Sequence, residues 1–177
     1  AVPRRSRVRR WMLRLRLLAL ASCVLALAHP YARGGARRET RDGIDIMLAF
    51  DISSSMLAED FLPQNRLEVA RTQVKEFVRM RESDRIGVVS FAGEALTQVP
   101  LTADHQVVLA AIEQLQPGQL DDGTAIGTAI ATASNRLRSA SGTSKVLVLL
   151  TDGVNNRGQV DPRTAARAAA AFGIRVY

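Results

Sequence analysis

Cysteine and histidine are scarce in this sequence of 177 residues, which contains one cysteine and two histidines. The single cysteine, Cys23, cannot form an intrachain disulfide or build a cysteine-based metal site. A serine hydrolase would need a histidine base, and His105 is the one histidine outside the amino-terminal segment. The G-x-S-x-G turn of many such enzymes is also missing. Disulfide-rich domains, thiolate metal sites and serine hydrolases are therefore disfavoured.

Acidic residues are almost absent from the first part of the chain. Residues 1–41 contain eleven arginines and one acid, Glu39, whereas the remaining residues contain 13 basic and 16 acidic residues. The net charge of +7 therefore comes from the amino-terminal segment. Since nucleic-acid binding needs basic residues on the folded surface, we expect no nucleic-acid function. Arginines beside an apolar run favour a membrane partner instead.

The amino-terminal segment, residues 1–31, combines this arginine cluster with an apolar run. The run from Trp11 to Ala28 is about the minimum length for a membrane-spanning helix, so we predict a transmembrane helix over about residues 11–28. The arginine excess on its amino-terminal side places the following domain outside the cytoplasm by the positive-inside rule. The alternatives are a signal peptide cleaved at Ala26-Leu27-Ala28 and a buried or interfacial helix.

The rest of the chain alternates between strand patterns and helix patterns. A Gly-, Arg- and Thr-rich linker is expected over 32–43, followed by one domain over 44–177. Strands are predicted at 44–50, 85–91, 95–99, 145–150 and 174–177, and helices at 66–80, 104–115, 124–137 and 161–172. This alternation predicts an α/β fold, a doubly wound and mainly parallel sheet with helices on both faces. Because the chain starts at Ala1 and stops within an apolar run, we expect a fragment whose domain is incomplete at its carboxyl end.

Polar side chains follow the two most apolar strand patterns. Asp51, Ser53 and Ser55 follow the first strand in a D-x-S-x-S pattern, and Asp152 follows the strand at 145–150. Thr124 begins a helix between them. In an open parallel sheet, loops at the carboxyl ends of neighbouring central strands meet at the topological switch point, so these five side chains are expected to converge. Carboxylate and hydroxyl oxygens select Mg²⁺, Mn²⁺ or Ca²⁺ over zinc or copper.

Each of these residues also has an ordinary structural interpretation when it is taken alone. Serines after a strand lie in loops or cap helices, Asp152-Gly153 is a common turn, and Thr124 is a candidate helix N-cap. Seven other polar residues have a turn, capping or exposed loop position as their ordinary interpretation: Glu59, Asp60, His105, Asp121, Asp122, Asn155 and Asn156. As alternatives, Asp121 and Asp122 could add charge around the metal, Glu59 and Asp60 could shape partner choice, and Asn155 and Asn156 could line the rim of the site. The five candidates in order, all near strand ends, favour a metal site.

The sequences D-I-S-S-S, D-G-T and L-L-T-D-G resemble the metal-ion-dependent adhesion site of von Willebrand factor A (VWA) domains. The likeness covers about residues 43–177 and is similar in detail to the BatA-like bacterial aerotolerance subgroup. It implies a Mg²⁺ site that an Asp or Glu of a protein partner completes. It also implies a bacterial inner-membrane location, with the domain on the periplasmic side by the charge rule above, and association with a MoxR-type ATPase and related membrane proteins.

We therefore expect a membrane-anchored binding module and not an enzyme. The rival enzyme is a haloacid dehalogenase-like phosphotransferase, which also places an aspartate after its first strand and uses Mg²⁺. That chemistry resembles a D-x-D pattern, and Ser53 stands where the second carboxylate is needed. A metal-independent membrane scaffold is the other alternative, and it predicts that Asp51 has no role in partner binding.

Overall fold

A computed structural model of the chain describes residues 4–27 and 43–177. The chain divides into two compact units, Ala1–Glu39 and Thr40–Tyr177, and each is described by itself. The first contains helix α1 (Arg4–Leu27). Nearly all of the predicted linker, and the last residue of the predicted membrane span, lie outside the described residues.

The predicted transmembrane helix is not supported by the structure, although a helix does form in this segment. Within residues 4–27 and 43–177, no helix has both the length and the apolar character needed to cross a membrane. The physical reason is charge, because Arg14 and Arg16 interrupt the apolar side chains of α1. They leave Leu17–Leu27 as its longest uncharged stretch, well short of the roughly 20 residues that a spanning helix needs.

The second unit is built on a five-stranded sheet with the order β3-β2-β1-β4-β5. Its strands are β1 (Asp45–Asp51), β2 (Arg85–Phe91), β3 (Ala95–Thr102), β4 (Lys145–Leu150) and β5 (Ile174–Val176). The other elements are the 3₁₀ turn η1 (Ser54–Leu57) and the helices α2 (Arg66–Arg79), α3 (His105–Gln114), α4 (Ile126–Arg138) and α5 (Pro162–Ala171). All neighbouring strands are parallel except β2 and β3, so the predicted mainly parallel α/β fold is confirmed.

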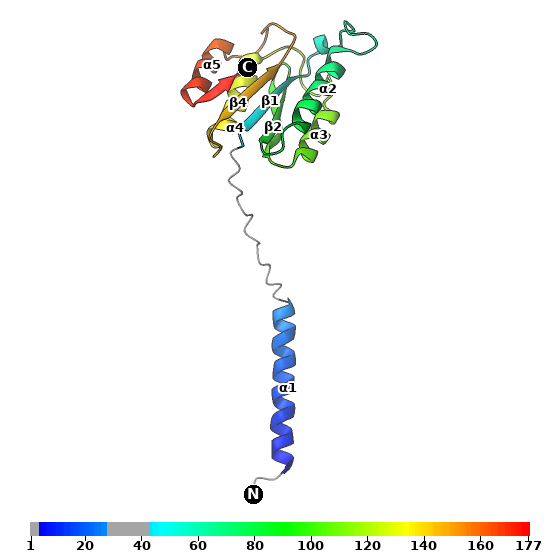
Figure 1. Ribbon diagram of the computed structural model, residues 1–177, viewed down its shortest axis with the longest axis vertical. Coiled ribbons are helices and arrows are strands. Elements are labelled where there is room, and N and C mark those ends of the chain that lie inside the picture. The colour runs from blue at the N-terminus through cyan, green and yellow to red at the C-terminus, as the bar shows by residue number, and fades with distance from the viewer. Residues whose placement is uncertain (1–3, 28–42) are drawn as a thin grey trace. The chain divides into compact units, whose positions relative to one another are not determined.

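The helices cover both faces of the sheet, as the doubly wound pattern predicts. Strand β1 is fully buried and supplies side chains to both faces: Phe50 packs in the cluster with α2 and α3, and Met47 packs in the cluster with α4 and α5. Figure 1 shows α2 and α3 on one side of the sheet and α4 and α5 on the other. A strand buried on two faces must be apolar almost throughout, which is why this segment reads as a continuous run.

Two predicted elements differ from the structure by two or more residues at one end. Strand β3 continues past Pro100 to Thr102 because it is an antiparallel edge strand with a shifted register, where the missing N–H of proline is tolerated. Helix α4 begins at Ile126, with Ala125 rather than Thr124 at the N-cap. The Thr124 side chain is therefore not used to cap this helix.

A half-buried ion pair joins the amino-terminal ends of β1 and β2. Asp45 is 1% exposed and accepts from Nε and Nη2 of Arg85, each at 2.7 Å, and from the backbone N–H of Gly142 at 2.8 Å. The hydrogen bonds with Asp45 raise the pKa of Arg85 above its already high ordinary value. The pair lies at the sheet edge opposite to the candidate site, and its contribution is to stability.

We expect Asp45→Ala to lower the free energy of unfolding by about 2–3 kcal/mol, because it leaves the guanidinium and a backbone N–H without their acceptor. The loss stays below that of a fully buried pair, since the Arg85 side chain is 38% exposed and water can reach it. Urea unfolding of both proteins measures the difference. Glu82→Ala, at an exposed position shortly before β2, is the control and should change stability by less than about 0.5 kcal/mol.

Candidate metal site

The candidate residues meet where the strand order reverses, between β1 and β4. Both strands run in the same direction and pair with one another, so their carboxyl ends open onto one edge of the sheet. Asp51 is the last residue of β1, and Asp152 follows β4 by two residues. Topology alone therefore places both carboxylates at the switch point, where open α/β sheets bind their ligands.

Asp51 is a buried carboxylate with uncharged hydrogen-bond donors. It is fully buried, its Oδ1 accepts from the backbone N–H of Ser53 at 2.9 Å, and its Oδ2 accepts from the hydroxyl of Thr151 at 2.6 Å. No Lys, Arg or His of the described ranges forms an ion pair with it. A buried charge without a counter-charge is costly, so this position favours a bound cation.

The two serines connect Asp51 to Asp152. The η1 turn after β1 brings the hydroxyl oxygens of Ser53 and Ser55 within 3.0 Å of one another. Ser55 also donates from its hydroxyl to Oδ1 of Asp152 at 3.0 Å. Ser53 is buried and Ser55 is exposed, so the oxygens lead from the interior to the surface. Four of the five predicted ligands thus form one connected group.

Thr124 is buried beside this group without a direct hydrogen bond to it. Its backbone N–H donates to Oδ1 of Asn156 at 2.8 Å, and its carbonyl accepts from the backbone N–H of the same residue at 3.1 Å. These two bonds hold Thr124 against the loop that carries Asp152. A Cβ placed on Gly153 would lie 3.1 Å from Oγ1 of Thr124, so the hydroxyl faces the turn at Gly153.

Asp122 forms hydrogen bonds with Ser54 inside the D-x-S-x-S turn. Its carboxylate accepts from the backbone N–H of Ser54 at 3.1 Å and from the hydroxyl of the same serine at 2.8 Å. These bonds with Ser54 are the main reason why the pKa of Asp122 is lowered. Asp122 is therefore not only a turn residue, because its hydrogen bonds stabilise the loop between Ser53 and Ser55.

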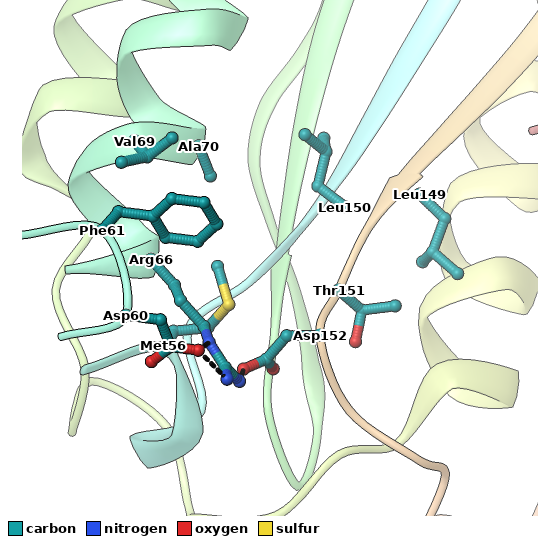
Figure 2. A pocket seen from close by; sticks show the side chains of 10 residues that line it. All are labelled: Met56, Asp60, Phe61, Arg66, Val69, Ala70, Leu149, Leu150, Thr151 and Asp152. Atoms are coloured by element: carbon teal, nitrogen blue, oxygen red, sulfur yellow. Dashed lines mark hydrogen bonds and ion pairs between the residues drawn. The ribbon is translucent and has the colours of Figure 1, made fainter. Parts of the chain in front are cut away.

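Arg66, the first residue of α2, forms an ion pair with one of the predicted ligands. It forms ion pairs with Oδ2 of Asp152 and with Oδ2 of Asp60. The hydrogen bonds that Arg66 donates to Asp152, the larger cause, and to Asp60 raise its pKa. Figure 2 shows the guanidinium lying between the two carboxylates.

A cavity of about 550 Å³ opens beside this ion pair. Its polar end is formed by Asp60, Arg66 and Asp152, and its apolar wall includes Phe61 and Leu150 (Figure 2).

The residues present fit a hard divalent cation. The donors are two carboxylates and two or three hydroxyls, the oxygen ligands that Mg²⁺, Mn²⁺ and Ca²⁺ prefer. In the part of the chain that the structure describes, no group of three or more His, Cys, Asp or Glu side chains forms a metal cluster. A site here must therefore rely on serine and threonine oxygens together with water. That composition suits Mg²⁺, which keeps several waters when it binds to proteins.

Four residues around the site were not identified as functional from the sequence: Arg66, Asp122, Thr151 and Asn156. Their hydrogen bonds join residues 86, 68, 100 and 32 positions apart, respectively. No local pattern reports a partner at such a distance. Two of the four carried a signal within the resemblance: Asp122 is the first residue of D-G-T, and Thr151 lies within L-L-T-D-G.

The fold and the site together define a class. A mainly parallel sheet covered on both faces, with oxygen side chains gathered at the switch point, is a Rossmann-like α/β domain. Within that class, the chain belongs to the von Willebrand factor type A domain family, whose model matches residues 46–155.

Individual relatives agree with the predicted VWA identity and its aerotolerance-type resemblance. An aerotolerance-related membrane protein of Bacteroides fragilis is 38% identical, with a TM-score of 0.70 over 76% of this chain and 65% of its own. A UPF0353 protein of Mycolicibacterium paratuberculosis is 35% identical over 90% of this chain and 50% of its own length. Proximal thread matrix protein 1 of the mussel byssus, with a zinc-occupied MIDAS motif, is 26% identical, with a TM-score of 0.66 over 76% and 34%. The chain spans about half the length of the curated relatives it matches.

Proposed function

We propose that this chain is a metal-dependent protein-interaction module. In this proposal, Asp51, Ser53, Ser55, Thr124 and Asp152 hold a divalent cation, and a carboxylate of a protein partner completes its coordination. The observation that carries the proposal is the buried Asp51 carboxylate, which meets only neutral donors and opens onto a group of hydroxyl oxygens. A cation at this position would neutralise a charge that the fold otherwise leaves uncompensated.

Mg²⁺ is the proposed ion, and Mn²⁺ or Ca²⁺ would use the same oxygens. The zinc-occupied MIDAS motif of the mussel byssus protein supports metal binding at this kind of site without fixing the ion. When bound, the ion supplies a Lewis-acidic position for a carboxylate ligand. The chain's own residues orient that position, because Thr151 holds Asp51 at the start of the D-x-S-x-S turn and Asp122 holds Ser54 between the two serines.

We propose binding rather than catalysis. A phosphotransferase of the D-x-D type needs a second carboxylate where Ser53 stands. The histidine that a serine hydrolase would require is far from the site: the ring of His105 bonds the carbonyl of Asp84 at 2.9 Å, directly before β2. Since β1 and β2 are parallel, that contact lies at the sheet edge opposite to Asp51.

Membrane association is part of the proposal, supported by the membrane proteins among the relatives and by the arginine-rich first segment. The periplasmic side of a bacterial inner membrane and the association with a MoxR-type ATPase stay predictions from the sequence.

The test is a calorimetric titration of the 177-residue chain with Mg²⁺ after treatment with a chelator. We expect binding in the micromolar to millimolar range, roughly 4–8 kcal/mol. Acetate should tighten Mg²⁺ binding if a carboxylate completes the site, because coupling between two ligands is reciprocal. Chloride at equal ionic strength and acetamide are the controls. Mg²⁺ affinity that does not respond to acetate would contradict the carboxylate step, and absence of binding with and without acetate would contradict the metal site.

A further inference from the structure

Arg66 occupies part of the carboxylate group that the proposed metal site needs. Oδ1 of Asp152 accepts from the hydroxyl of Ser55, and Oδ2 is held by the guanidinium of Arg66. Asp152 is one of only two carboxylates among the five candidate ligands. The positive charge of Arg66 at one oxygen of Asp152 repels a cation that binds at the other oxygen. Water screens this repulsion only partly at the site.

The same guanidinium has a second partner. Nε of Arg66 donates to Oδ2 of Asp60 at 2.8 Å, and Nη2 contacts the same oxygen. Asp60 lies in the loop between η1 and α2, and its side chain is 43% exposed. Arg66 can therefore release Asp152 without becoming unpaired, because Asp60 keeps two of its nitrogen donors.

The backbone of Arg66 is held independently of these ion pairs. Asn65 and Glu68 form a capping box at the start of α2, with Oδ1 of Asn65 accepting from the N–H of Glu68 at 2.9 Å. The backbone N–H of Arg66 also donates to the carbonyl of Ala58 at 3.1 Å. A change confined to the Arg66 side chain is thus expected to leave the start of the helix in place.

We propose that Arg66 is an internal competitor for Asp152 that lowers the metal affinity of the site, and that Asp60 sets how strongly it competes. This inference rests on the metal site proposed above. In the metal-free chain, Arg66 neutralises Asp152 and holds the loop after β4 to the start of α2. In the metal-loaded chain, Arg66 withdraws from Asp152 and pairs with Asp60.

Competition and simple anchoring predict different results for Arg66→Gln. If Arg66 competes, the variant has a lower melting temperature than the parent in the absence of metal. It nevertheless binds Mg²⁺ about 3- to 10-fold more tightly, because Asp152 is released. If Arg66 only anchors Asp152 for the metal, both the melting temperature and the affinity fall. Arg79→Gln, at an exposed position at the other end of α2, makes the same change of charge and should alter neither quantity by a comparable amount.

Asp60→Asn provides a second test with the opposite sign. Removing Asp60 commits Arg66 to Asp152, so Mg²⁺ binding should weaken by about 3-fold or more. In the Arg66→Gln background, the same substitution should have a much smaller effect, because no guanidinium is left to redirect. Equal effects of Asp60→Asn in both backgrounds would show a general charge effect and would overturn the role of Asp60 in the competition.

The experiment is calorimetry with Mg²⁺ on the four full-length chains (the parent, Arg66→Gln, Asp60→Asn and the double variant), with thermal melting in chelator. Tighter binding by Arg66→Gln, including binding that appears only in this variant, supports the competition. Binding by the parent with equal or weaker binding by Arg66→Gln overturns the competition and leaves the metal site standing. Absence of Mg²⁺ binding by all four chains overturns both proposals.

Discussion

Asp51→Asn is expected to lower Mg²⁺ affinity by at least about 100-fold, beyond detection in an ordinary titration. The substitution removes one of the two carboxylate charges that face the cation, and it does so at the buried position where the interaction is screened least. Loss of a hydrogen-bonded charged partner in such a site typically costs about 2–5 kcal/mol. Millimolar binding by the parent chain would then become too weak to measure.

The same variant is expected to keep or slightly raise the melting temperature in chelator. An asparagine Oδ1 can still accept from the N–H of Ser53, and its amide can donate to the hydroxyl oxygen of Thr151. What disappears is a buried charge that only neutral donors stabilise in the metal-free chain. A site kept for its chemistry and not for stability should show this combination of lost binding and retained stability.

Thermal melting with and without Mg²⁺, together with calorimetry, measures both effects. Glu76→Gln is the matched control, because it removes one negative charge from an exposed position on α2. Mg²⁺ binding by Asp51→Asn with the affinity of the parent would rule out Asp51 as a ligand. The same result would favour the alternative of a metal-independent membrane scaffold.

The strands could be predicted because burial dictates their composition. The bounds of β2 and β4 agree with the predicted 85–91 and 145–150. Strand β1 is displaced by one residue, because Asp51 itself pairs with Phe91 as the last position of the strand. Where an apolar run is bounded by polar turns, the strand can begin and end at few other positions. The neighbouring positions of β1 and β4 follow from the doubly wound pattern, and pairing between the two confirms them.

The amino-terminal segment shows where hydropathy was less informative. The helix formed, but the membrane-spanning prediction counted apolar residues on both sides of Arg14 and Arg16 as one run. Charges inside such a run are costly in a bilayer.

The site was predictable to the extent that its residues follow strand ends. D-x-S-x-S and the aspartate after β4 were sufficient to place four of the predicted ligands in one hydrogen-bonded group. The surrounding contacts were not predictable, because they depend on which distant loop faces the site. Arg66 looks like an ordinary residue in the first turn of a helix until the structure places Asp152 beside it.

Gly127→Ala is expected to destabilise the domain by at least about 3 kcal/mol, although alanine normally stabilises a helix relative to glycine by about 0.5–1 kcal/mol. Gly127 is the second residue of α4, and a Cβ at this position would lie 1.8 Å from the carbonyl oxygen of Val160. The obstacle is backbone just before α5, so no side-chain rotation can relieve it. Helix α4 and the segment before α5 would have to separate. The melting temperature should fall by about 10 °C or more.

This strain is also expected to reach the metal site. The N–H of Gly127 donates to Oδ1 of Asn155 at 3.4 Å, and the next residue, Asn156, holds Thr124 beside the Asp152 loop. Separation at Gly127 should therefore weaken Mg²⁺ binding even at temperatures where the variant is folded. Asn135→Ala, at an exposed position on the same helix, is the control and should change stability by no more than about 0.5 kcal/mol. Asp51→Asn loses binding and keeps stability, whereas Gly127→Ala should lose both. A Gly127→Ala chain that melts like the parent would show that the close approach of α4 to Val160 is not required for the fold.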